Sequence, residues 1–260
     1  MLLLNSPFVS NPHSVADPLT QFTIVLAALL HDVDHDGVPN AVLEKEHSDE
    51  PNAERHSIDL AFEILMEPKY RELRFTIYRD EAEMRRFRQL LVHTIMSTDI
   101  ADKQLKELRE KRWKKTFEEV KTENVTSGNS PKEEQDRKAT LAIEALIQAS
   151  DVLHTMQPFD VYKQWNERLF VEMYKAYKEG RTDVDPGTFW YKGEIGFFDF
   201  YVIPLARKLQ QCQVFGTMGD ECLGFARANR QAWMLKGPSA VNSMIRKVQI
   251  EENATHWTSD

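Results

Sequence analysis

The sequence predicts an all-α protein, on three observations. Gly is scarce, with 10 in 260 residues, and the 11 Pro cluster in short connectors. Runs of alternating apolar and polar residues bounded by turn pairs, which indicate strands and hairpins, are hard to find. Apolar residues instead recur at helical spacing along most of the chain.

The helices are predicted in order along the chain. Asp17-Pro18 supplies an N-cap and a first turn for a helix through Leu30, which is apolar nearly all round and is therefore expected to be buried. Residues 36–52, polar and holding two Pro, are expected to form a loop with one short helix at most. Further helices are expected at 53–66, 81–98, 103–120, 132–150, 158–178, 195–212 and 220–235.

The chain is long enough for one large domain or two small ones. Residues 121–131, which hold Gly128 and Pro131, are the best linker candidate. Candidate site residues lie on both sides of this segment, so we expect one domain over residues 1–236 with an internal flexible loop near 121–131. Residues 237–260 are expected to form a loosely ordered tail.

Charge and cysteine content exclude several classes of function. The net charge of −8 gives no bulk attraction to nucleic acid or to an anionic membrane. The basic stretch Lys106–Lys115 is interleaved with Glu, as is typical of a solvated helix face. Two Cys cannot make a disulfide framework, and the longest apolar run, Ile24–Leu30, is too short to span a membrane. We therefore expect a cytoplasmic protein with no nucleic-acid partner and no membrane insertion.

The segment His31–Asp36 gathers two His and three Asp directly after the apolar helix. Buried charges must be paired or bound to metal. Adjacent residues on a regular helix point about 100° apart, so His31 and Asp32 converge on one ion only near a helix end, which Gly37 indicates. His35, one turn beyond His31, suits a role in holding a metal-bound water. The alternative is a surface loop whose acids and histidines are simply solvated.

Imidazole and carboxylate together suit Zn²⁺, Mn²⁺ or Fe, and a carboxylate can bridge to a harder ion such as Mg²⁺. Two such ions, about 4 Å apart, clamp a phosphate and turn a bridging water into hydroxide. This segment therefore predicts a metal-dependent phosphohydrolase.

Six short segments occur in the order known from one family, and they are spread over residues 31–205. They are His31-Asp32-Val33-Asp34-His35-x-Gly37-Val38-x-Asn40, Ser97-Thr98-Asp99, Ala149-Ser150-Asp151, Tyr162-x-x-Trp165, Gly196-Phe197-Phe198-Asp199 and Pro204-Leu205. In these residues the chain resembles the catalytic domain of class I 3′,5′-cyclic nucleotide phosphodiesterases. The resemblance implies a compact multi-helical HD-domain fold. It also implies hydrolysis of cyclic AMP or cyclic GMP to the 5′-nucleoside monophosphate by a two-metal-activated hydroxide, in signal transduction.

The resemblance also implies a metal centre. His31, Asp32 and Asp151 would bind two divalent ions, with Asp32 bridging Zn²⁺ and Mg²⁺ or Mn²⁺. The residues expected to hold metal-bound waters are His35, Glu54 and Thr98.

A purine pocket is implied as well. Phe197 would stack on one face of the base, with Leu169 on the other and Ile100 also in contact with the substrate. Trp165 is expected to support the core rather than contact the nucleotide.

Three departures from the family pattern matter. The family's His-Asn-x-x-His motif, which supplies a metal ligand and the general acid, would precede Met1, so we expect a truncated chain of weak or no activity. Glu194 stands where the family has a purine-reading Gln. An ionised carboxylate only accepts hydrogen bonds and suits guanine, which favours cyclic GMP unless Glu194 is protonated or turned to solvent. His154 replaces an Asn and is expected to contact the base or fill space.

Two other functions stay open. One is another HD-type nucleotide phosphohydrolase, although Trp165 and Phe197 are not required by a bare HD fold. The other is an inactive module that binds cyclic nucleotide without turnover. Fusion to regulatory or cyclase domains in a longer protein is also compatible with the sequence.

Overall fold

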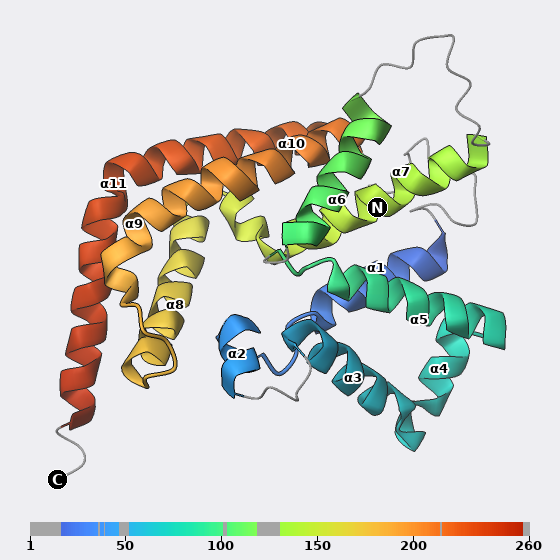
Figure 1. Ribbon diagram of the computed structural model, residues 1–260, viewed down its shortest axis with the longest axis horizontal. Coiled ribbons are helices and arrows are strands. Elements are labelled where there is room, and N and C mark those ends of the chain that lie inside the picture. Colours follow the sequence, from blue (N-terminus) through green and yellow to red (C-terminus); the bar gives the residue numbers. More distant parts are fainter. Residues whose placement is uncertain are drawn as a thin grey trace. The chain divides into compact units, whose positions relative to one another are not determined.

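The computed structural model describes residues 17–35, 37–38, 40–46, 52–100, 103–118, 131–213 and 215–256. The described part consists of helices and their connectors and contains no strand, which confirms the all-α prediction (Figure 1). The helices are α1 (Pro18–Leu30), α2 (Asn40–Glu46), α3 (Ala53–Met66), α4 (Arg71–Ile77), α5 (Glu81–Met96), α6 (Lys103–Trp113), α7 (Pro131–Asp151), α8 (Phe159–Lys178), α9 (Pro186–Phe197), α10 (Ile203–Cys212) and α11 (Thr217–His256).

Several helix starts are fixed by side-chain caps of the kind that the sequence predicts. A carboxylate or amide oxygen at the N-cap accepts a hydrogen bond from a backbone N–H of the first turn, which stabilises a helix by about 1 kcal/mol. Asp17 accepts from Thr20 N at 2.9 Å, and Asn52 accepts from Arg55 N at 3.2 Å. Pro18 follows the Asp17 cap as the first residue of α1, where its missing N–H costs nothing.

The chain divides into two compact units. The first holds residues 1–35, 51–151 and 208–219, and the second holds 36–50, 152–207 and 220–260. This division does not fall at the linker candidate, most of which lies outside the described residues. The single domain with an internal loop stays a prediction.

The first unit is built around a core that α1, α3, α5 and α7 share. Its buried members are Ala27, Ile58, Phe87, Leu91, Ile95 and Ile147. Apolar residues at spacings of three and four along α5 place one face of that helix in this core. Because α1, α5 and α7 pack on the same core, their C-terminal ends are held in fixed positions within the unit.

The second unit packs around aromatic rings. Tyr162 of α8 meets Phe198 edge-on at 5.2 Å between ring centroids, and meets Trp233 of α11 at 5.8 Å. Phe170 and Trp190 form a second edge-on pair at 5.2 Å. Such pairs add about 0.5–1.5 kcal/mol each to the burial of the rings, so α8, α9 and α11 are firmly joined.

Two predictions about elements are wrong. The helix through Leu30 is not buried all round, because Val25 is 63% exposed and Leu29 75% exposed on α1. The predicted tail from residue 237 is instead the continuation of α11 through Pro238 to His256. Val241, Met244 and other apolar residues on this part of α11 are buried, and this burial stabilises the helix beyond the Pro.

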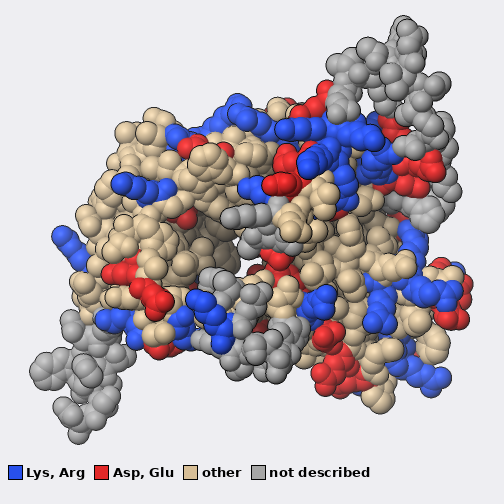
Figure 2. Space-filling model, in the orientation of Figure 1, with Lys and Arg blue, Asp and Glu red and all other residues tan. Residues whose placement is uncertain are grey.

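Within the described residues, no helix combines the length and the apolar character that crossing a bilayer requires. On the face drawn in Figure 2, Lys and Arg lie interspersed with Asp and Glu rather than in a field of one sign.

Candidate metal centre

Three side chains with metal-ligating atoms come together in the first unit. His31 and Asp32 directly follow the end of α1, and Asp151 is the last residue of α7. His31 Nε2 lies 3.2 Å from Asp32 Oδ2 and 3.7 Å from Asp151 Oδ1. One ligand atom from each residue lies within 4.8 Å of the other two. We call His31, Asp32 and Asp151 the trio.

The two ring nitrogens of His31 have different surroundings. Nδ1 donates to the carbonyl of Ala28 at 3.0 Å, which fixes the ring orientation. Nε2 is buried and has no hydrogen-bond partner among the described residues. The carboxylates of Asp151 and Asp32 raise the pKa of His31 to about 10, and His31 in turn lowers the pKa of Asp32. The trio therefore favours one positive charge at Nε2, which a proton or a metal ion can supply.

The trio fits a divalent ion by chemistry and by spacing. Ligand atoms bound at about 2.0–2.2 Å to one ion lie roughly 3–4 Å from each other, and the separations from His31 Nε2 are 3.2 and 3.7 Å. One imidazole with two carboxylates suits Zn²⁺, Mn²⁺ or Fe²⁺. The Asp32 side chain is 61% exposed, which leaves room for water or a second ion at its carboxylate.

Contacts from α3 hold the loop that carries the first two members of the trio. His56 Nε2 lies 3.0 Å from Asp34 Oδ2, and the Ser57 hydroxyl donates to the carbonyl of Val33 at 3.0 Å. Asp34 has a φ of 60°, in the left-handed region that Asp tolerates better than most residues. The turn after α1 is therefore held by α3 at Val33 and Asp34.

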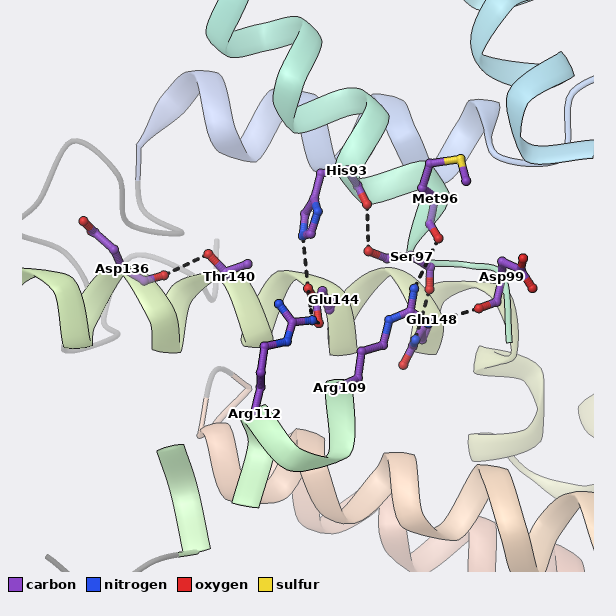
Figure 3. Close-up of polar contacts among 10 residues, drawn as sticks. All are labelled: His93, Met96, Ser97, Asp99, Arg109, Arg112, Asp136, Thr140, Glu144 and Gln148. Atoms are coloured by element: carbon purple, nitrogen blue, oxygen red, sulfur yellow. Dashed lines mark hydrogen bonds and ion pairs between the residues drawn. The ribbon is translucent and has the colours of Figure 1, made fainter. Parts of the chain in front are cut away.

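The segment after α5, which carries the predicted water-holding residue Thr98, is held by two long side chains (Figure 3). Gln148 of α7 donates to the carbonyl of Ser97 at 3.0 Å, and Arg109 of α6 donates to the carbonyls of Asp99 at 3.0 Å and Met96 at 3.2 Å. Sequence reasoning missed Gln148 and Arg109. Gln148 precedes Asp151 by three residues, and this spacing on one helix face is the only signal that the sequence offered.

Thr98 itself is 9% exposed, and its hydroxyl donates to the carbonyl of Ile95 at 2.7 Å. The oxygen of that hydroxyl keeps lone pairs that can accept a further bond. Glu54 lies at the start of α3, His35 is exposed in the loop after α1, and Ile100 is 40% exposed after α5. Their roles toward metal-bound water and substrate stay predictions.

The predicted purine-reading residue lies in the second unit, on α9. The Tyr162 hydroxyl donates to Glu194 Oε2 at 2.7 Å. Burial raises the pKa of Glu194 to about 7, and the bond from Tyr162 offsets only part of that effect. Burial and the Glu194 carboxylate raise the pKa of Tyr162, so Tyr162 stays a donor. Glu194 is therefore neither in open solvent nor fully protonated at neutral pH.

The other predicted substrate residues also lie in the second unit. Phe197 ends α9, one turn after Glu194, and stacks on Tyr201 with 5.3 Å between ring centroids. His154 of η4 (Leu153–Met156) lies parallel to the Tyr162 ring at 6.5 Å. Leu169 is 44% exposed on α8. Contact of these residues with a base stays a prediction.

Trp165 does not have the role expected from the sequence. Its side chain is 49% exposed rather than part of the core. Arg168 covers the ring, with its guanidinium carbon 4.7 Å from the ring centroid. Trp165 lies at the edge of the buried face of α8, which Tyr162, Asn166 and Phe170 form.

Comparison with known proteins identifies the family. Residues 2–218 match the model of the 3′5′-cyclic nucleotide phosphodiesterase family, so this chain belongs to that family. A probable 3′,5′-cyclic-AMP phosphodiesterase of Caenorhabditis elegans, pde-4, is 25% identical over 78% of the chain and 31% of the relative. A probable 3′,5′-cyclic phosphodiesterase of the same organism, pde-3, is 29% identical over 75% of the chain and 28% of the relative. The chain thus spans about a third of the length of these curated relatives.

Solved structures agree with the family. The phosphodiesterase domain of the Salpingoeca rosetta rhodopsin phosphodiesterase is 25% identical, with a TM-score of 0.64 over 91% of this chain and 70% of that one. A second structure of the phosphodiesterase domain from this choanoflagellate fusion protein has a TM-score of 0.61 and 26% identity, over 88% of this chain and 71% of that one. The multi-helical fold of phosphodiesterase catalytic domains, expected from the sequence motifs, is thereby confirmed.

Proposed function

We propose that this chain carries the metal centre of an enzyme that hydrolyses 3′,5′-cyclic nucleotides to 5′-nucleoside monophosphates. The observation that carries the proposal is the trio, in a chain that belongs to the cyclic nucleotide phosphodiesterase family. The relatives named above are a probable 3′,5′-cyclic-AMP phosphodiesterase and a probable 3′,5′-cyclic phosphodiesterase.

The trio would hold Zn²⁺ together with Mg²⁺ or Mn²⁺, with Asp32 as the bridging carboxylate. Divalent ions at such a site polarise a phosphoryl oxygen and supply a nucleophilic hydroxide from water at neutral pH. The contribution of the protein is orientation: the bond from His31 Nδ1 to Ala28 leaves Nε2 free for an ion. The contacts of Gln148 and Arg109 hold the segment of Thr98 in place.

The Glu194 carboxylate supports a preference for cyclic GMP over cyclic AMP as the substrate. The Tyr162 hydroxyl already donates to Oε2, which leaves Oε1 to meet a base. When ionised, Oε1 only accepts, and guanine offers the neighbouring donors N1–H and N2–H₂. Adenine offers an unprotonated ring nitrogen beside its amino group, which would face a lone pair at a cost of about 1–3 kcal/mol.

A larger protein that joins this chain to regulatory or other domains is also proposed. The chain spans 28–31% of the curated relatives named above, and the similar solved domains come from a rhodopsin fusion. A cytoplasmic location stays a prediction.

Turnover with matched variants tests the activity. The purified chain is incubated with cyclic AMP or cyclic GMP and with Mn²⁺ or Mg²⁺ plus Zn²⁺, and the 5′-monophosphates are quantified chromatographically. We expect the hydrolysis to require a metal ion, because the trio would hold the ion that supplies the hydroxide. We expect it to be slow, because the trio does not supply a proton to the leaving O3′ oxygen. Asp151→Asn should lower the rate at least about tenfold, whereas Asp59→Asn, an exposed acid on α3, should leave it unchanged. Hydrolysis that is as fast in Asp151→Asn as in the wild type would contradict the proposal.

The base preference should depend on pH. Because the pKa of Glu194 is about 7, its ionised fraction rises from roughly a tenth at pH 6 to roughly nine tenths at pH 8. The ratio of kcat/KM for cyclic GMP over that for cyclic AMP should therefore rise over this range. Glu194→Gln should make the ratio independent of pH, while the exposed Glu179→Gln should behave as the wild type. A ratio that is flat or falls with pH in the wild-type chain would exclude this role.

A further inference from the structure

A groove of about 450 Å³ lies in the first unit, where α5 and α7 meet the start of α1. Leu90 of α5 and Ile143 of α7 give it apolar sides, and Asp136 and Thr140 of α7 give it polar groups. Its volume is within the range of about 300–1,000 Å³ that small-molecule sites occupy. None of the trio lines it.

The Arg86 guanidinium at the groove is already paired with a carboxylate, that of Asp17. Arg86, which lines it, donates to Asp17 Oδ2 at 2.5 Å and to the Thr20 hydroxyl at 2.9 Å. This pairing neutralises the charge of Arg86. The Arg86 guanidinium is therefore not available to attract an anion to this end of the groove.

His93 lines the groove about two turns beyond Arg86 on α5, and its ring is in contact with Glu144 of α7 (Figure 3). Its Nε2 lies 3.1 Å from Glu144 Oε1, and Arg112 donates to both oxygens of Glu144 at 2.8 and 2.9 Å. Glu144 is 4% exposed. The charge of Glu144 is thus matched by Arg112, and the contact with Glu144 fixes the orientation of the His93 imidazole.

Asp136 is the group that stays unmatched. Its Oδ1 is buried and has no hydrogen-bond partner among the described residues. The nearby Thr140 hydroxyl donates to the backbone carbonyl of Asp136, at 2.9 Å, rather than to its carboxylate. A buried acceptor without a donor is costly and rare in folded proteins, and a ligand that brings an N–H donor would remove that cost.

The balance of charge decides which ligand fits. Arg86 pairs with Asp17 and Glu144 with Arg112, so the carboxylate of Asp136 leaves the groove with an excess of negative charge. We propose that this groove binds a small organic cation that carries N–H donors on an apolar body. The donors would meet Asp136, and the apolar body would pack between Leu90 and Ile143.

Benzamidine is the probe, because it joins an amidinium to one aromatic ring. Titration calorimetry on the whole chain should detect benzamidine binding at millimolar or lower concentration. Benzoate, with the same ring and the opposite charge, should not bind. Binding is measured without metal or nucleotide, so its outcome is independent of the proposed hydrolysis. Absence of benzamidine binding, or equal binding of benzoate, would overturn the proposal.

Two variants of equal charge assign the site. Asp136→Asn keeps the shape and removes the carboxylate, so benzamidine affinity should fall at least tenfold. Glu107→Gln, an exposed acid on α6, changes the net charge equally and should leave the affinity as it is. A cooperative thermal transition of the free Asp136→Asn chain, close to that of the wild type, would show that the variant is folded. Equal benzamidine affinity in Asp136→Asn and the wild type would refute the site.

Discussion

Glu144 shows how a buried carboxylate in the first unit is held in its ionised form by its partners. Burial alone would raise the pKa of Glu144, but the hydrogen bond from His93 and the charge of Arg112 hold it below its ordinary value. Both partners are half-exposed, so the carboxylate is the buried member of the cluster. The cluster joins α5 and α6 to α7, the helix that ends in Asp151 (Figure 3).

Removal of this carboxylate should destabilise the chain. Glu144→Ala leaves His93 and Arg112 without their partner, yet both can reach water, so we expect a loss of about 1–3 kcal/mol in the free energy of unfolding in urea at pH 7. The lowered pKa means that the contribution is present above the ordinary Glu pKa and is lost as pH falls through the folded value. The difference from the wild type should therefore shrink toward pH 3. A difference that grows on acidification would contradict this assignment.

At the residue scale, the sequence predicted the groups that meet in the trio but not the side chains that support them. His31 and Asp32 stand out because charged residues directly follow an apolar helix. The prediction that Asp151 is a metal ligand came from the family resemblance. The bonds of Arg109 and Gln148 to backbone carbonyls leave no such trace, because backbone acceptors carry no sequence signature.

At the scale of elements, helix positions followed from periodicity and caps, while exposure and helix ends did not. The expected helix at 53–66 has the bounds observed for α3. The C-terminal segment was misjudged because Gly237 and Pro238 are ordinary stop signals. Tertiary packing overrides them: the Gly237 position is buried, and a Cβ there would lie 2.8 Å from the Tyr191 ring.

The C-terminal part of α11 should therefore contribute to stability. Met244 is 2% exposed, and its truncation to Ala should cost about 2–5 kcal/mol in the free energy of unfolding. Asn242→Ala, at an exposed position on the same helix, should change it little. Urea unfolding compares the two. Equal, negligible effects would show that this segment is a loose tail after all.

At the scale of the whole molecule, the trio and the predicted base-reading residues belong to different compact units. His31, Asp32 and Asp151 lie in the first, and Glu194 and Phe197 in the second. Neither unit is one continuous segment, so the sequence alone gave no sign of this division. The motifs that indicate the family are spread over both units.

Metal binding by the trio tests the account most directly. Mn²⁺ titration followed by electron paramagnetic resonance should show a bound ion in the wild-type chain and in the exposed-site control Asp59→Asn. The affinity should fall at least about tenfold in Asp151→Asn and in His31→Ala. Wild-type binding that survives both substitutions, or no binding in the wild type, would contradict the assignment of the trio as the metal centre.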